Sequence, residues 1–84
     1  MKLKFVDDYI NSKLQQNDEF VRFTFYELRV KNNLTEEETN EFLELAKNRF
    51  ENMNYRVYFT NDVYNYNNQE MIVQINELMV AIKN

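Results

Sequence analysis

The chain has 84 residues, of which 44% are hydrophobic and 15% aromatic, and it carries a net charge of −4. This length predicts a single domain over residues 1–84, with a core too small to provide much stability. The chain has no Cys, His, Gly or Pro. These absences argue against disulfides, Cys or His metal sites, glycine-rich phosphate loops and His-based catalysis. We therefore expect a protein that is not an enzyme and that uses no cofactor and no metal.

The sequence also bears on location. No apolar run approaches the roughly 20 residues that a membrane span needs. The acidic pair Asp7-Asp8 stands where a signal peptide would have its apolar centre. We expect a cytoplasmic protein with no membrane span.

The first half of the chain predicts a helix, a strand and two more helices. Apolar residues at helical spacing predict a helix over residues 3–16, and alternating apolar residues predict a strand over residues 21–25. Thr24 and Thr35 are each followed three residues later by Glu, which is the spacing of a helix capping box. We expect a short helix after Thr24, a turn at residues 32–33, and a third helix from Thr35 to about residue 53.

The second half predicts a hairpin and a last helix. Residues 55–60 and 63–66 alternate like strands, and Asn61-Asp62 suits a two-residue turn between them. The last helix is predicted over about residues 69–83. Its apolar residues recur every three or four positions: Met71, Ile72, Ile75, Leu78, Met79 and Ile82. They exceed what one small core can cover, so we expect this helix to form a homodimer.

This order of elements resembles the winged helix-turn-helix superfamily. The resemblance depends on residues 23–28 (FTFYEL), Leu34-Thr35 at the start of the third helix, its apolar stripe through Phe42 and Phe50, and residues 54–57 leading into the wing. It implies an α+β fold of helix, strand, helix, helix, two-stranded wing and C-terminal helix. It also implies double-stranded DNA binding, usually by the helix after the turn.

The charges of the third helix disagree with that mode of docking. It would present Glu36, Glu37 and Glu38 to DNA phosphates, which would repel them. We expect the wing to make the specific contacts instead, because amides pair with adenine and Arg with guanine. The predicted wing contacts are Arg56, Tyr58, Thr60, Asn61, Asn65 and Asn67. The predicted phosphate contacts are Arg29, Lys31, Lys2 and Lys4.

The size, the Asn- and Tyr-rich composition and the acidic third helix are also similar to small dimeric accessory proteins of low-GC, clostridial-type conjugative plasmids. That resemblance implies sequence-specific binding at a transfer origin, or transcriptional regulation on a mobile element, with protein partners in a nucleoprotein complex. An alternative is an inhibitor that binds a basic protein through the Glu-rich third helix. A third is a homodimeric structural module that binds no nucleic acid.

Overall fold

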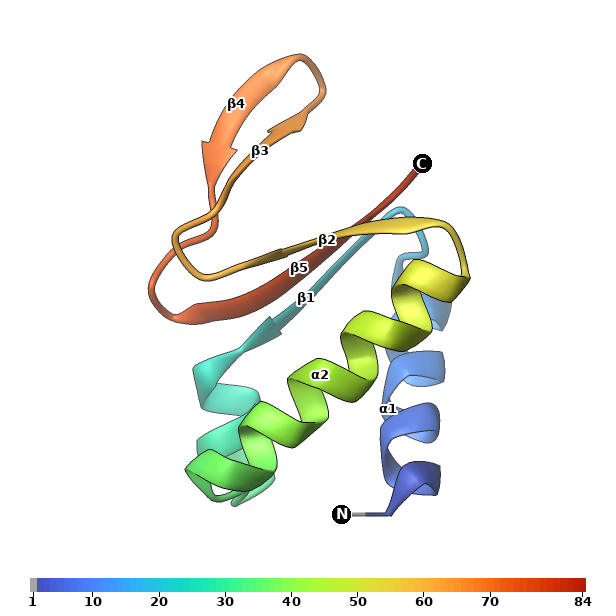
Figure 1. Ribbon diagram of the computed structural model, residues 1–84, viewed down its shortest axis with the longest axis vertical. Coiled ribbons are helices and arrows are strands. Elements are labelled where there is room, and N and C mark those ends of the chain that lie inside the picture. The colour runs from blue at the N-terminus through green and yellow to red at the C-terminus, as the bar shows by residue number, and fades with distance from the viewer. Residues whose placement is uncertain (1) are drawn as a thin grey trace.

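The computed structural model describes residues 2–84 as three helices and five strands. The helices are α1 (Leu3–Gln16), η1 (Tyr26–Lys31) and α2 (Glu36–Asn52). The strands are β1 (Phe20–Thr24), β2 (Tyr55–Phe59), β3 (Val63–Tyr66), β4 (Gln69–Ile72) and β5 (Glu77–Lys83). In Figure 1 the helices occupy one end of the molecule, and β3 and β4 project from the other.

The strands form two antiparallel sheets. One has three strands in the order β1-β5-β2, and the other consists of β3 and β4 alone. The last strand in the chain is therefore the central strand of the larger sheet. The fold is α+β, but the predicted winged helix-turn-helix is wrong, because α2 is followed by four strands and no C-terminal helix.

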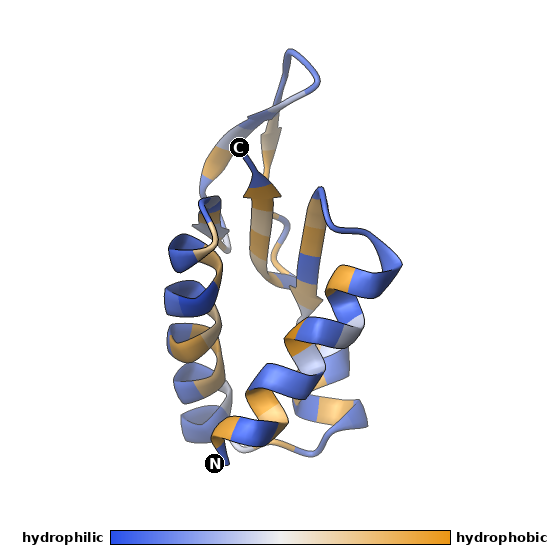
Figure 2. Cartoon of the chain, turned by 90° about the vertical axis from the view of Figure 1, so that its right-hand side faces the viewer, coloured by the Kyte–Doolittle hydropathy of each residue, from blue (hydrophilic) through white to orange (hydrophobic). Residues whose placement is uncertain are grey.

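The main core lies between the three-stranded sheet and the helices. The ring of Phe23 on β1 lies 5.4 Å from that of Phe42 and 6.1 Å from that of Phe50, both on α2. Figure 2 shows hydrophobic residues along β1 and β5 and hydrophilic residues over much of the outer side of the helices. The buried members are Val6, Ile10, Val21, Phe23, Leu28, Phe42, Ala46, Phe50, Tyr55, Met79 and Ala81.

Both predicted helix starts are present. The Glu38 N–H donates to Thr35 Oγ1 (3.1 Å), and the Thr35 N–H donates to the Glu38 carboxylate (3.0 Å), which completes the capping box. The Glu27 N–H likewise donates to Thr24 Oγ1 (3.2 Å). The short helix that follows is a π-helix, in which the Asn32 N–H donates to the Glu27 carbonyl five residues back.

The predicted hairpin has the right strands but the wrong pairing. Residues 55–59 and 63–66 are strands, and Asn61 adopts a positive φ of 74° in the turn between them. However, β2 pairs with β5, and β3 pairs with β4. The local alternation predicts the strands, but it carries no information on β5, where the sequence predicts a helix.

The predicted last helix is also wrong, because residues 69–83 form β4, a turn and β5. A central strand covered on both faces is a continuous apolar run without alternation. Residues 79–82 are accordingly all buried. Ile72 and Ile75, which fitted the helical stripe, are 60% and 82% exposed. Dimerisation through a C-terminal helix is therefore contradicted.

Asn residues take the positive φ values that glycine usually takes. Asn tolerates the left-handed region better than other non-glycine residues. In this glycine-free chain, the positive-φ residues of the described part are Asn33, Asn54, Asn61, Asn67 and Asn68.

Candidate nucleic-acid interface

Strands β3 and β4 form a two-stranded arm, residues 63–72, that projects from the body of the protein (Figure 1). Its two-residue turn is Asn67-Asn68, with φ of 53° and 64°. Positive φ at both positions is the type I′ geometry, whose twist matches that of antiparallel strands. Figure 2 shows that the end of the arm is hydrophilic. The arm therefore presents side-chain amides to solvent at its tip.

A second, smaller core holds the base of the arm against the sheet. Tyr64 and Val73 are buried there against Val80 and Ile82 of β5. Along β5 these two residues alternate with Met79 and Ala81 of the main core, so this is the outer face of the sheet, opposite the helices. The half-buried residues around this core are Phe20, Tyr58 and Tyr66.

Arg22 lies near the base of the arm and is absent from the predicted site. Its guanidinium pairs with the Glu77 carboxylate at 3.0 Å. Burial and the Glu77 charge raise the pKa of the Tyr64 hydroxyl, while the Arg22 charge opposes this shift. A signal was present in the sequence, because Arg22 stands between the inward-facing Val21 and Phe23 and so belongs to the outer face.

Four of the predicted wing residues are exposed on the arm side of the molecule. Asn61 lies at the base of the arm, Asn65 on β3 and Asn67 at the tip. Arg56 is exposed on β2, opposite Ile82 of the second core. No ion pair involving Arg56 occurs within residues 2–84. This guanidinium is therefore available to a ligand.

Two other predicted wing residues are engaged in the fold. The Tyr58 ring packs 5.6 Å from that of Tyr64 and is half-buried. The Thr60 hydroxyl donates to the Glu77 carbonyl at 2.8 Å. We assign both a structural role, since base contacts would require them to leave these partners.

The predicted phosphate contacts lie away from the arm. Lys2 and Lys4 lie at the start of α1, at the end of the molecule opposite the arm (Figure 1). The Arg29 guanidinium donates to the Leu34 carbonyl at 3.0 Å and lies over the Phe25 ring. Lys31 lines a groove beside η1. The structure therefore does not gather these four cations around the arm.

The arm itself carries no cation and one acidic residue, Glu70, and a second acid, Asp62, directly precedes it. The Asp62 carboxylate accepts from the Phe59 N–H at 2.9 Å, which holds it in the turn between β2 and β3. Positive charge close to the arm comes from Arg56 and from Arg22, which is paired. The attraction between DNA phosphates and this site is therefore weak. Any sequence specificity would depend on the side-chain amides of the arm and on the shape of the groove.

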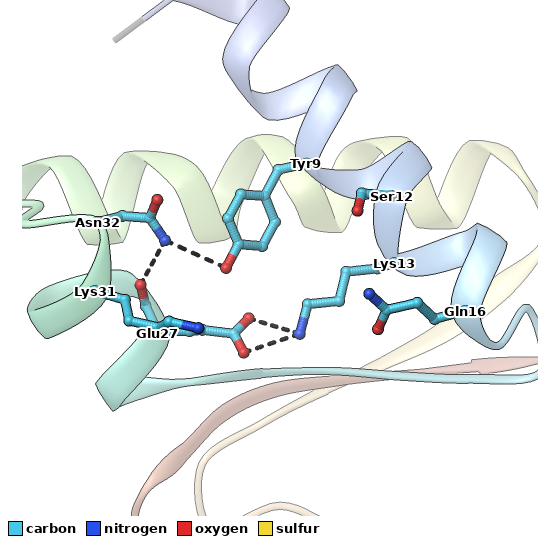
Figure 3. A pocket seen from close by; sticks show the side chains of 7 residues that line it. All are labelled: Tyr9, Ser12, Lys13, Gln16, Glu27, Lys31 and Asn32. Atoms are coloured by element: carbon cyan, nitrogen blue, oxygen red, sulfur yellow. Dashed lines mark hydrogen bonds and ion pairs between the residues drawn. The ribbon is translucent and has the colours of Figure 1, made fainter.

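A polar groove of about 470 Å³ lies between α1 and η1 (Figure 3). The Lys13 ammonium crosses it and contacts both carboxylate oxygens of Glu27, at 2.8 and 2.9 Å. The Asn32 side-chain amide bridges the Tyr9 hydroxyl and the Glu27 carbonyl. Burial, followed by the Glu27 charge, raises the pKa of Tyr9, and the bond from Asn32 opposes this. These contacts join the helices.

The groove has little capacity for chemistry. Its hydroxyls belong to Ser12 and Tyr9, and within residues 2–84 the Ser12 hydroxyl has no base hydrogen-bonded to it. The Lys13 and Glu27 charges cancel, which leaves Lys31 as the remaining charged residue of the lining. We assign the groove a structural role.

The solvent-facing side of α2 is acidic. Glu37, Glu44 and Glu51 are exposed there at spacings of seven residues, or two helical turns. Arg49 on the same helix pairs with Asp7 at 2.8 Å, so its charge is already engaged. This acidic side would repel DNA.

Comparison with known proteins adds no assignment. No family model, curated protein or solved structure significantly matches this chain. Within residues 2–84, no helix is both long and apolar enough to cross a membrane. The same residues contain no cluster of three or more acidic side chains suited to a metal ion.

Proposed function

We propose that this chain binds double-stranded DNA by inserting the β3–β4 arm into a groove. The observation that carries the proposal is the Asn67-Asn68 turn, which places exposed amides at the tip of a projecting two-stranded ribbon. A ribbon of two strands fits the major groove, and an Asn amide can pair bidentately with adenine. Asn65 and Gln69 add further exposed amides next to the tip.

Arg56 is the proposed anchor beside the arm. It is exposed and has no ion-pair partner within the described chain. Arg can pair with guanine or hold a phosphate oxygen. With so few cations nearby, affinity per chain is low and depends little on salt. Because we assign the chain no catalytic residues, we propose an accessory or regulatory role on DNA, with other proteins in the complex.

The test is a selection of bound sequences from a random duplex pool at low salt, followed by a footprint of the protein on the enriched sequence. The matched variant is Asn67→Gly/Asn68→Gly, since Gly keeps the type I′ turn and removes both amides. We expect a short enriched motif for the wild type and its loss in the variant. A lack of enrichment for the wild type at low salt would contradict DNA binding.

A second candidate function is binding of a basic protein through α2. It is favoured by the exposed carboxylates of Glu37, Glu44 and Glu51, for which the described chain supplies no ion pair. Such a face would steer association with a cationic partner. An oligoarginine peptide is a suitable probe. Replacing these three residues by Lys should abolish peptide binding and leave arm-centred DNA binding intact.

A further inference from the structure

The outer edge of the arm is open. The register pairs Tyr66 with Gln69 across the turn and Tyr64 with Met71. The residues flanking a two-residue turn form a hydrogen-bonded pair, and such pairs alternate along the ladder. Tyr64 and Met71 are therefore also hydrogen-bonded to each other. Glu70 and Ile72 occupy the alternate, non-hydrogen-bonded positions of β4. Their N–H and C=O groups therefore point away from β3, out from the free edge.

Nothing in the described chain covers this edge. All four residues of β4 are exposed. No hydrogen bond outside the arm's own ladder involves the main chain of Glu70 or Ile72 within residues 2–84. Tyr64 of β3 belongs to the second core and Tyr66 packs against it, whereas β4 contributes no buried or half-buried residue to that core. Strand β4 is thus the free side of the arm (Figure 1).

Three apolar side chains on the arm are exposed, two of them on β4 and one opposite it on β3. Met71 is 41% exposed and Ile72 is 60% exposed, and Val63, opposite Ile72, is 52% exposed. Proteins usually protect open edges with Lys, Pro or a bulge. None of these occurs in β4, whose one charged residue is Glu70. A ribbon of two strands is also marginally stable in water unless more strands join it.

We propose that β4 pairs with β4 of a second copy of this chain, antiparallel and centred on Met71. This register sets Glu70 opposite Ile72 of the partner copy, and Ile72 opposite the partner copy's Glu70. All four outward main-chain groups of each strand then find a partner. The interface is isologous, because both copies contribute the same strand. The two Met71 side chains meet on the axis, and no carboxylate lies directly opposite another.

The result is a four-stranded sheet shared by two chains. The Asn67-Asn68 tips lie at opposite ends of this sheet, so both tips remain exposed. This inference is independent of DNA binding, because it depends only on the open edge and on the apolar side chains beside it.

A cross-link measures the register directly, since the wild-type chain has no Cys. Met71→Cys places two thiols at a non-hydrogen-bonded pair, where Cα atoms are about 4.5 Å apart and a disulfide can form. Gln69→Cys is the matched control, because residue 69 lies on the same face of β4. In the proposed register the two residues 69 are offset by four positions along the strands, or about 13 Å, so their thiols cannot meet. Mild oxidation should give a disulfide dimer for Met71→Cys and at least tenfold less for Gln69→Cys. Equal yields, or a higher yield for Gln69→Cys, would overturn the register.

Sedimentation equilibrium tests the dimer itself. The wild type should sediment at twice its 10.4 kDa chain mass. Glu70→Pro removes an outward N–H without affecting the arm's own ladder, and should raise the dimer dissociation constant at least tenfold. Asn65→Pro removes the equivalent N–H on the β3 edge and should leave the dimer intact. A wild type that stays monomeric at millimolar concentration, or prolines with equal effects, would overturn the proposal.

Discussion

The ammonium group of Lys13 on α1 lies 2.8 and 2.9 Å from the two carboxylate oxygens of Glu27 on η1. It also donates to the Arg22 carbonyl of β1 at 2.9 Å. One side chain therefore joins three elements that are separate in the sequence. Both charged groups are largely shielded from solvent, with side-chain exposures of 21% and 16%.

Replacing Lys13 by Met should destabilise the protein by about 1–3 kcal/mol, because a mostly buried carboxylate loses its partner. Lys31→Met is the control, since Lys31 lines the same groove but forms no ion pair within residues 2–84. It should change stability by less than about 0.5 kcal/mol. Urea unfolding followed by circular dichroism measures both. Similar losses in the two variants would contradict the assigned role of the pair.

Tyr9 should make the free energy of unfolding fall as the pH rises above 10. Burial raises its pKa above the ordinary value of 10.0 in the folded chain. Above pH 10 the unfolded chain therefore loses this proton first, and rising pH favours unfolding until the folded-state pKa is passed. Tyr9→Phe should reduce the slope of the unfolding free energy against pH above pH 10. Tyr64 shifts in the same direction, so the slope should not vanish. An unchanged slope would argue against this account.

The capping box of α2 can be tested by one exchange. Thr35→Ala should cost about 1 kcal/mol, because the Glu38 N–H loses its acceptor. Thr35→Asp keeps an acceptor at the same position and should retain most of the stability. Thermal unfolding gives the comparison. Equal melting temperatures for the Ala and Asp variants would mean that the cap contributes little.

A substitution of Arg56 tests whether this residue of β2 anchors the proposed DNA interface. Arg56→Ala should weaken binding to an enriched duplex by about 5- to 150-fold, the range expected for one base contact. Lys47→Ala, on the α2 side, is a control that should leave binding unchanged. Fluorescence anisotropy with a labelled duplex measures both. Wild-type affinity in Arg56→Ala would exclude this residue from the interface.

The helical half of the fold could be predicted from sequence because its signals are local. The helix at residues 3–16 and the Thr35 cap were each predicted at the correct position. Hydroxyl and carboxylate spacing fixes a helix start within one turn, so no distant contact is needed. These local signals did not predict the π geometry of η1.

The strand pairing could not be predicted because it depends on distant partners. Strand β5 lacks alternation, since residues 79–82 are buried between the main core and the second core. Its apolar run matches a helix as well as a buried strand. The alternation of residues 55–60 and 63–66 and the Asn61-Asp62 turn predict a local hairpin, and no local signal marks β5 as the true partner of β2.

The candidate site was predictable in part. The exposure of Asn61 and Asn65 follows from the turn and strand positions that the sequence indicates, whereas Asn67, expected just before the last helix, lies in the turn between β3 and β4. The structural role of Thr60 depends on its bond to the Glu77 carbonyl, 17 residues away, and no local signal marks it. The separation of Lys2 and Lys4 from the arm likewise requires the whole fold.

The central claim is that the tip amides of the arm contact bases. The most direct measurement is the affinity of an enriched duplex for the wild type and for Asn67→Gly/Asn68→Gly, at one low salt concentration, with Asn33→Gly as a control at another left-handed turn. We predict at least a fivefold loss for the tip variant and none for the control. Equal affinities for all three proteins would contradict the claim.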